Sequence, residues 1–355
     1  IEVPAEPTPG SAAEPTPENT PEPRATELPY NGVYAPAEHA RVATEDELID
    51  LYWWMIETGH PTVYLEALEV PLGDVSDITD KFSNYFDKYR AIYDPPAVRV
   101  EFKPGLRALH AFEGGNLDSL DEDAREVADK ALAVVDELVR DGMTAWEKEL
   151  VLHDYVVDHC DYALNPFAPH NGDSLGFFRY GAVGCAGYCD IFRLLGKLAG
   201  LEVEMIGGPT TRDPSGSKGH AWCLVRLNGL WYVVDPAWDD PIEDEPTLEH
   251  TFFNVPFSAF GETRRWDEAY LPDGDLAVTL DEQYYYNRPE YQADSRDAAV
   301  EAAVRQLDES GRAYLMVDDD LAKSVSQALA QRYGKKGSCA EMSEDLSFNL
   351  FRYRF

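Results

Sequence analysis

Apolar residues recur at helical spacing through the middle of the chain. Two long stretches, 121–140 and 145–159, carry this spacing and are enriched in Asp or Glu in their first turns, which is typical of helix N-termini. A third helical stretch covers 185–198 and stops at Gly200, and residues 201–206 then alternate like a strand. We therefore expect a buried helix that begins near Cys185 and leads into a sheet.

A strand-like pattern marks the next segment, "GHAWCLVRLNGLWYVVDPAWDDP". Its two alternating runs flank Asn228-Gly229, the strongest short signal for a β-hairpin turn. If the turn has two residues, Trp222 stands opposite Asp235, and His220 lies on the same face, diagonal to Asp235. The hairpin register therefore predicts a hydrogen bond between the His220 imidazole and the Asp235 carboxylate.

Segments on either side of this centre repeat one order of predicted elements, which is helix, strand, helix, strand. Two related α/β modules would produce this order, and so would two ordinary α+β pieces without common origin. On the N-terminal side we predict helices at 46–55 and 78–93, a strand at 60–70, and paired strands over 97–112 broken at Pro104-Gly105. On the C-terminal side we predict helices at 296–311 and 322–334 and strands at 312–320 and 345–355.

The predicted class is α+β, with a helix carrying Cys185 packed on an antiparallel sheet carrying His and Asp. We divide the chain into an N-terminal α/β module (31–118), a central domain (119–290) and a C-terminal α/β module (291–355). Residues 1–30 precede them as a disordered tether, because they are dense in Pro, Thr and Glu and almost empty of large apolar residues.

Composition restricts the partners of the protein. Its 355 residues are 44% apolar, enough for real cores, and 66 acidic against 30 basic residues give a formal charge of −36. Such a charge repels phosphate backbones, so we expect no nucleic-acid partner, and a solvated acidic surface is the simplest interpretation. No segment is apolar enough to span a bilayer. The oligomeric state cannot be predicted.

The Pro-Thr-rich start suggests a surface tether of the kind that follows an export signal or a lipid-anchored Cys in bacterial proteins. We therefore expect an extracellular or cell-surface bacterial lipoprotein, attached to the membrane only through an N-terminal anchor that this sequence lacks. The five cysteines are too few, and odd in number, for a disulfide framework, so at least one is free or intermolecular.

Cys185 is the candidate nucleophile. At a helix N-terminus, free amides and the positive end of the dipole favour the thiolate, and the Cys185 amide can donate to an oxyanion. Gly184 and Gly187 would let a substrate backbone come close. His220 supplies a base whose tautomer Asp235 fixes. The alternative interpretation of Cys185 is a small buried core residue.

Other histidines and a metal site must be weighed beside this set. His153 is expected to pack behind the site, with a direct role as the less favoured alternative. A zinc site is a competing interpretation, because three cysteines and one histidine could form a ligand set. His220 and Cys223 are an odd number of residues apart in one strand, so their side chains point to opposite faces of the sheet, and only a β-bulge would bring them to the same face. We expect no metal and no cofactor. The competing zinc ligand set is Cys185, Cys189, His220 and Cys223.

These motifs resemble the transglutaminase-like superfamily, in particular its bacterial secreted branch with a papain-type Cys-His-Asp centre. The resemblance extends over about 145–266. The resemblance implies that Cys185 is the nucleophile, His220 the base and acid, and Asp235 the orienting carboxylate. The segments that carry it are "LHDYVVDHCDYALN", "VGCAGYCDIFRLLGKLAGLEVEMIGG", "GHAWCLVRLNGLWYVVDPAWDDP" and "FFNVPFSAFGETRRW".

Two residues depart from the family pattern. Ala186 replaces a polar residue, often Gln, after the nucleophile, and Cys223 replaces an expected Asn. The loss at Ala186 would leave backbone amides as the oxyanion donors. Tyr188, Trp222 and Trp238 are candidates for walls of the substrate cleft, or else are ordinary core aromatics.

The resemblance implies attack of a thiolate on an amide carbonyl, with release of the acyl group to water or to an amine. We expect hydrolysis, as a peptidase or amidase, with a protein or peptide substrate and cell-wall peptide as one candidate. The alternative is a catalytically weak or inactive surface module that binds peptide or glycan.

Overall fold

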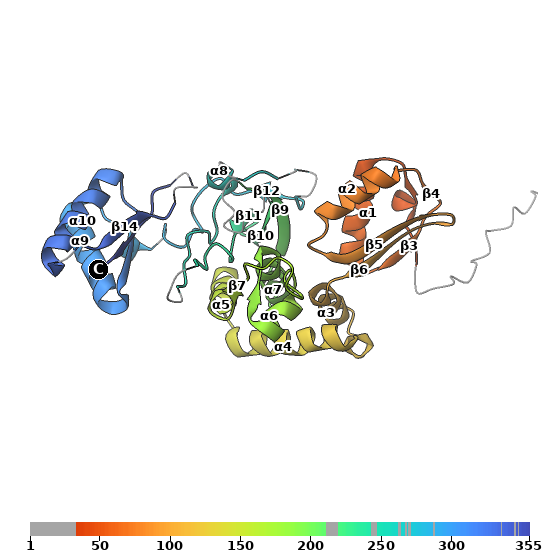
Figure 1. Ribbon diagram of the computed structural model, residues 1–355, viewed down its shortest axis with the longest axis horizontal. Helices are drawn as coiled ribbons and strands as arrows, with labels where there is room; N and C mark the ends of the chain where they lie inside the picture. Colours follow the sequence, from red (N-terminus) through yellow and green to blue (C-terminus); the bar gives the residue numbers. More distant parts are fainter. Residues whose placement is uncertain are drawn as a thin grey trace, which may run out of the picture.

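The computed structural model describes most of the chain and arranges it as three parts along its longest axis (Figure 1). The N-terminal module and the C-terminal module lie at opposite ends, with the central domain between them. The predicted tether at 1–30 lies outside the described residues. Those residues are 33–210, 219–242, 247–261, 264–266, 268, 271–286, 288–334, 336–343, 346 and 348–355.

The N-terminal module packs two helices against a four-stranded sheet of order β1-β3-β6-β5. Its first helix, α1, begins with a capping box at Thr44 and ends at Gly59 in the left-handed conformation, which explains its sharp limits. The elements are β1 (Val33–Tyr34), η1 (Ala37–His39), β2 (Arg41–Val42), α1 (Glu45–Thr58), β3 (Thr62–Tyr64), β4 (Ala67–Leu68), α2 (Leu72–Lys81), β5 (Phe86–Tyr93) and β6 (Pro96–Phe102).

Two N-terminal predictions were wrong. The helix predicted over 78–93 ends at Lys81, and β5 follows, because its aromatic residues pair antiparallel with β6. The second strand predicted within 97–112 is instead the helix α3 (Pro104–Glu113). Pro104 at the first turn fits a helix start, since its missing N–H is not needed there.

Helices and a sheet form the central domain, with α7 lying against β10 and β9. The sheet order is β12-β11-β10-β9; β9, β10 and β11 are antiparallel and β12 is parallel to β11. The mixed α+β class predicted from the sequence is confirmed. The elements after α3 are η2 (Leu117–Ser119), α4 (Glu122–Leu138), α5 (Ala145–Asp158), β7 (Asp161–Tyr162), α6 (Ser174–Tyr180), β8 (Ala182–Val183), α7 (Cys185–Leu198), β9 (Val203–Pro209), β10 (Gly219–Leu227), β11 (Leu230–Val234), α8 (Phe257–Phe260), β12 (Asp275–Leu276) and η4 (Pro289–Tyr291).

Two apolar cores cover the two faces of this sheet. Ala221, Cys223 and Val225 of β10 join the core that contains α7, and this core continues into the N-terminal module. Trp222 and Leu224 of the same strand join a second core that contains α8. The alternation predicted for β10 therefore separates its side chains as expected.

The C-terminal module has its own small apolar core. Its elements follow the order helix, strand, helix, strand, strand, and its last strand lies between the other two, as β6 lies between β3 and β5. This common topology agrees with the repeated order in the sequence, while a common origin stays a prediction, as do the domain limits. The elements are α9 (Arg296–Ser310), β13 (Arg312–Leu315), α10 (Asp319–Tyr333), β14 (Ser338–Glu341) and β15 (Phe351–Arg354).

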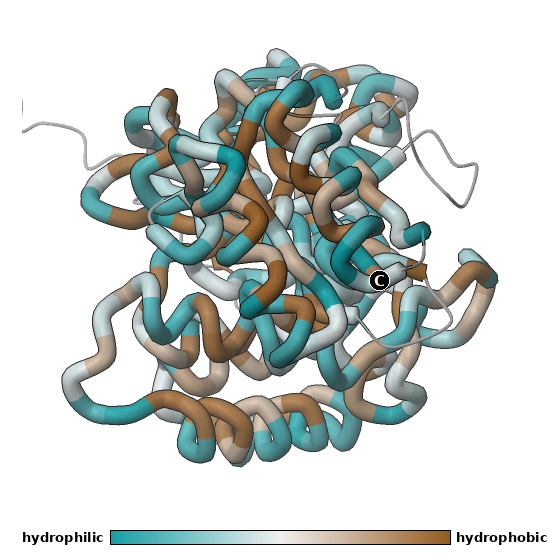
Figure 2. The backbone as a smooth tube through the Cα atoms, turned by 90° about the vertical axis from the view of Figure 1, so that its left-hand side faces the viewer, coloured by the Kyte–Doolittle hydropathy of each residue, from teal (hydrophilic) through white to brown (hydrophobic). Residues whose placement is uncertain are grey.

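Hydrophobic and hydrophilic residues alternate at short intervals along the backbone (Figure 2). Within the described residues, no helix combines the length and the apolar character that crossing a membrane requires.

Candidate active site

Cys185 is the first residue of α7, as the sequence predicts. Gly184 precedes it in an extended conformation and offers no side-chain cap to the helix. The first amides of a helix have no partner within it, so those of Cys185 and Ala186 remain available to a ligand or an oxyanion. The helix therefore supplies both the sulfur and the donors beside it.

The hairpin forms in the predicted register. Leu227 pairs with Leu230, and the two turn residues, Asn228 and Gly229, have φ values of 51° and 86°, as a two-residue turn of the primed type requires. Counting outward along the same register brings His220 beside Asp235. His220 Nε2 lies 2.7 Å from Asp235 Oδ2, and both side chains are buried.

The Cys185 thiol and the His220 imidazole line the same cleft, and each shifts the pKa of the other. Burial alone would raise the pKa of the Cys185 thiol, but the hydrogen bond and charge of His220 outweigh it, so the thiol pKa is lowered. Burial alone would lower the pKa of His220, yet the Asp235 carboxylate and the Cys185 sulfur raise it to about 9. These opposite shifts favour a thiolate-imidazolium pair near neutral pH.

Asp235 has partners besides His220. The backbone N–H of Trp238 donates to its Oδ1 at 3.2 Å, and Arg264 Nη2 lies 3.5 Å from its Oδ2. The Arg264 guanidinium stacks 3.9 Å from the centre of the Trp238 ring, and that ring lies 5.4 Å from the His220 ring. Arg264 and Trp238 therefore support the acid and the imidazole from behind.

A cleft of about 980 Å³ opens over the sulfur and the imidazole. Cys185, Ala186 and His220 form part of its floor, while Trp53 and Tyr85 come from the N-terminal module. The cleft is therefore built by two parts of the chain, and one wall could not be found from the central motifs. Its remaining lining includes Phe82, Asn84, Met205, Gly207, Gly208, Arg265 and Trp266.

None of the five residues predicted to contact substrate lines the cleft. Tyr188 and Trp222 are 0% exposed: the Tyr188 hydroxyl donates to the Cys160 carbonyl, and the Trp222 ring stacks near His220. A Cβ on Gly187 would come within 2.5 Å of Val183, so that glycine allows tight packing of α7.

Gly184 and Trp238 also lie behind the floor. A Cβ on Gly184 would meet the Asn171 side chain at 2.9 Å, and Trp238 packs under His220. Substrate contact for all five residues stays a prediction, and the structure gives each of them a packing role.

The zinc set weighed from the sequence is not brought together. Cys223 points into the core beneath α7 and its sulfur donates to the Cys189 carbonyl. In the described part of the chain, three or more His, Cys, Asp or Glu donor atoms lie within 4.8 Å of one another only at His153, Asp154 and His250.

Sequence reasoning missed Arg264 and the N-terminal wall of the cleft. Arg264 stands in the quoted segment "FFNVPFSAFGETRRW", but no spacing rule places a residue 29 positions after Asp235 against its carboxylate. Trp53 and Tyr85 belong to a module with no catalytic motif. Only the three-dimensional packing reveals these contacts.

Part of the chain is similar to known proteins. Residues 132–236 match the model of the transglutaminase-like superfamily. The kyphoscoliosis peptidase of Homo sapiens is 26% identical over 152 residues, which is 39% of this chain and 23% of that protein. The Mus musculus kyphoscoliosis peptidase is 25% identical over 170 residues, 44% of this chain and 25% of that protein. The chain thus spans about a quarter of the length of these relatives.

Two solved structures are also similar in part. A crystal structure of a TGase shares 10% identity and a TM-score of 0.28, covering 58% of this chain and 60% of that one. A putative protease from Parabacteroides distasonis shares 16% identity and a TM-score of 0.23, covering 46% and 35%. From the family match, and from the motifs that lie within it, the chain contains a domain of the transglutaminase-like superfamily.

Proposed function

We propose that this protein is a cysteine-dependent acyl-transfer enzyme that hydrolyses peptide or amide bonds. One observation carries the proposal: the Cys185 thiol and the His220 imidazole that Asp235 orients line one large open cleft together. A thiol paired with an oriented imidazole is the arrangement that covalent catalysis on acyl groups requires. The distant peptidase relatives agree with this class of chemistry.

The first half-reaction makes a thioester. The Cys185 thiolate attacks the amide carbonyl carbon, and the C=O electron pair moves onto oxygen, where the amides of Cys185 and Ala186 at the start of α7 can donate to it. When the C–N bond breaks, the His220 imidazolium gives its proton to the leaving amine. Asp235 keeps the imidazole in the orientation that both steps need.

Water completes the cycle. His220, now neutral, removes a proton from a water molecule that attacks the thioester carbonyl, and the C–S bond breaks to release a carboxylic acid and regenerate the thiol. An amine in place of water would give a cross-linked product instead. We favour water because the sequence has nothing that resembles the larger calcium-regulated cross-linking enzymes.

The proposed substrate is a protein or peptide, with bacterial cell-wall peptide as a candidate, and the proposed location is the cell surface. The composition of residues 1–29 supports the location. Fractionation of cells that carry the full-length gene would test it, and a purely cytosolic pool would contradict it.

Thiol labelling tests the function directly. Cys339 is exposed, while Cys160, Cys189 and Cys223 are buried, so a Cys339→Ala background leaves Cys185 as the accessible thiol. We expect rapid, stoichiometric alkylation of Cys185 by iodoacetamide in that background and its loss after His220→Ala.

Peptide-library cleavage then separates an enzyme from a binding module. Wild type should cleave and Cys185→Ala should not, with Cys339→Ala as the control that retains activity. Labelling no faster than that of free cysteine, together with peptide or glycan binding unchanged in Cys185→Ala, would instead identify a binding module.

A further inference from the structure

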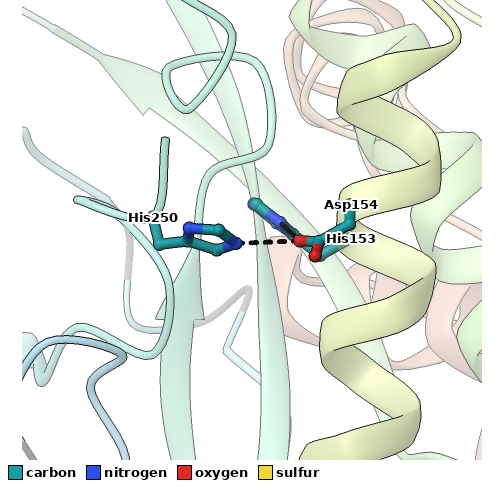
Figure 3. Close-up of side chains that lie close together, drawn as sticks. All are labelled: His153, Asp154 and His250. Carbon is teal, nitrogen blue, oxygen red and sulfur yellow. Dashed lines mark hydrogen bonds and ion pairs between the residues drawn. The ribbon is translucent and has the colours of Figure 1, made fainter. Parts of the chain in front are cut away.

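A second cluster of buried polar side chains lies away from the cleft, between α5 and the segment 247–254. His153 and Asp154 project from α5, and His250 reaches toward them from the facing segment (Figure 3). Both histidines point a ring nitrogen at one carboxylate oxygen: His153 Nδ1 lies 3.1 Å and His250 Nε2 lies 2.8 Å from Asp154 Oδ1. One ligand atom from each of the three residues falls within 4.8 Å of the others.

The ring nitrogens of His153 have an uncommon set of neighbours. Nδ1 faces Asp154, and Nε2 lies 3.1 Å from Asp239 Oδ2, so carboxylate oxygens stand on both sides of the ring. A neutral imidazole has only one N–H. With that N–H on the side of Asp239, the lone pair on Nδ1 faces an anionic oxygen. Either a second ring proton or a metal ion in that space turns the repulsion into a bond, and a bound ion would replace the proton.

We propose that His153, Asp154 and His250 bind one divalent transition-metal ion of the Zn²⁺ class. Two imidazole nitrogens and one carboxylate oxygen are ligands that suit Zn²⁺ and its neighbours, whereas Ca²⁺ and Mg²⁺ prefer all-oxygen sites. Neighbouring ligand atoms of a tetrahedral zinc site lie roughly 3.3 Å apart, given Zn–N and Zn–O distances of about 2.0–2.1 Å. The distances from Asp154 Oδ1 to the two histidines, 3.1 Å and 2.8 Å, need only a small outward adjustment.

The surroundings of the three ligands are those of a metal site. Asp239 accepts from the far nitrogen of His153, which is the carboxylate-histidine arrangement that fixes the tautomer of a metal ligand. The Tyr284 ring stacks on the His250 ring with 3.8 Å between centres and 8° between planes. The two carboxylates and a divalent ion sum to zero charge, which suits a buried position.

The three side chains differ in their exposure to solvent. His153 has no exposed side-chain surface, His250 is 9% exposed, and Asp154 is 32% exposed. Asp154 thus leaves an opening through which an ion can enter and a water molecule can complete the coordination. In a tetrahedral arrangement these three ligands would leave the fourth position to water.

The ion would stabilise the turn that carries Asp235, the carboxylate that orients His220. Asp239 follows that turn: its N–H donates to the Asp235 carbonyl at 3.1 Å, and its Oδ1 accepts from Phe252 N–H at 2.9 Å. Through Asp239 and His153, the site ties Asp235 to α5. Its role is therefore structural, and it does not depend on whether Cys185 is catalytic.

Titration with metal ions alone tests the proposal. The full chain without a histidine tag is stripped with a chelator and titrated with Co²⁺, whose visible absorption reports its ligands, and Zn²⁺ is then added as a competitor. We expect one equivalent of Co²⁺ with a nitrogen- and oxygen-type spectrum, displaced by Zn²⁺. Zn²⁺ should also raise the melting temperature in a concentration-dependent way, because it binds the folded state.

Variants assign the site. His250→Ala and Asp154→Asn should abolish stoichiometric uptake, and Asp239→Asn should weaken it by about 10–100-fold, the usual effect of losing a partner behind a ligand. Two controls should bind as wild type: Cys185→Ala, and His159→Ala, which removes the exposed histidine that ends the same helix.

Three results would overturn the proposal. In the first, the folded wild type takes up no Co²⁺. In the second, Co²⁺ uptake persists in both His250→Ala and Asp154→Asn. In the third, the Co²⁺ spectrum is of the thiolate type and disappears in Cys185→Ala. If the ligand variants do not fold, NMR of the wild-type protein labelled with ¹⁵N-histidine tests the site directly. Zn²⁺ should then shift the ring signals of two histidines, and unshifted signals would refute the site.

Discussion

His220 and His153 are both buried histidines that contact carboxylates, and they differ in their second partner. His220 bonds Asp235 through Nε2 and lines the open cleft together with the Cys185 thiol. In His153 both nitrogens face carboxylates, Asp154 and Asp239. A buried histidine-carboxylate pair is thus not catalytic in itself, because the second partner and the access to substrate decide its chemistry.

Removal of His220 should have the largest effect. Without the imidazole, Cys185 loses the hydrogen bond that lowers its thiol pKa and the leaving group loses its proton donor, so hydrolysis should fall by about 10²–10⁴-fold. Steady-state cleavage of a library-selected peptide by His220→Ala measures this, with thermal unfolding to verify the fold. Activity of His220→Ala within a few-fold of wild type would mean that His220 is not the catalytic base.

Removal of His153 should instead act on stability. His153→Ala leaves the buried carboxylate of Asp239 without its partner, and breaking such a pair typically lowers the free energy of unfolding by about 3–5 kcal/mol. Urea unfolding in the presence of a chelator measures the loss. In the fraction that stays folded, iodoacetamide should still label Cys185 at close to the wild-type rate, and a rate as low as that of His220→Ala would mean that His153 takes part in the chemistry.

The pH dependence of labelling sharpens the contrast further. The pKa of the Cys185 thiol is lowered, so its thiolate should form at a lower pH than that of a free thiol, whose pKa is roughly 8.5. The pKa of His220 is raised to about 9, so its imidazole stays protonated through this pH range. The alkylation rate of Cys185 should therefore reach half its plateau below pH 8.5. His220→Ala should move that midpoint upward by at least about one pH unit.

Cys339 offers an internal reference for this profile. Although the residue is exposed, partial desolvation of its sulfur raises the pKa of its thiol, so its midpoint should lie above that of a free cysteine. Mass spectrometry of the two alkylated peptides from one sample gives both profiles. Coincident midpoints for Cys185 and Cys339 would contradict the activation of Cys185 by its neighbour.

The two histidine sites also differ in how far the sequence predicts them. His220 and Asp235 are 15 residues apart and joined by one hairpin, so a turn motif and a period of two are enough to place them together. His153 lies 86 residues from Asp239, and Asp154 lies 96 from His250, and their contact depends on how a helix docks against a distant loop. Local periodicity contains no information about that docking.

The same distinction holds for the fold. The helix predicted over 296–311 forms almost as expected because its capping residue and its apolar spacing are local signals. The segment 86–93 has apolar residues compatible with a helix, and it becomes β5 because β6 is available as its partner. Tertiary contacts therefore determine β5. They also determine the N-terminal wall of the cleft, which includes Tyr85, the residue immediately before β5.

The hairpin turn provides the smallest test of the comparison, because the His220 site depends on it and the His153 site does not. Gly229 has a φ of 86°, and an added Cβ would meet no atom within 4 Å, so Gly229→Ala should cost about 1–2 kcal/mol through backbone strain alone. Gly73 is the matched control: its Cβ would also meet nothing, but it lies within α2, where alanine should stabilise by about 0.5–1 kcal/mol. Urea unfolding of both variants gives the difference. Shifts of opposite sign with unchanged labelling of Cys185 would show that the turn affects stability without changing the chemistry. Slower labelling in Gly229→Ala would show that the hairpin register sets the distance between imidazole and sulfur.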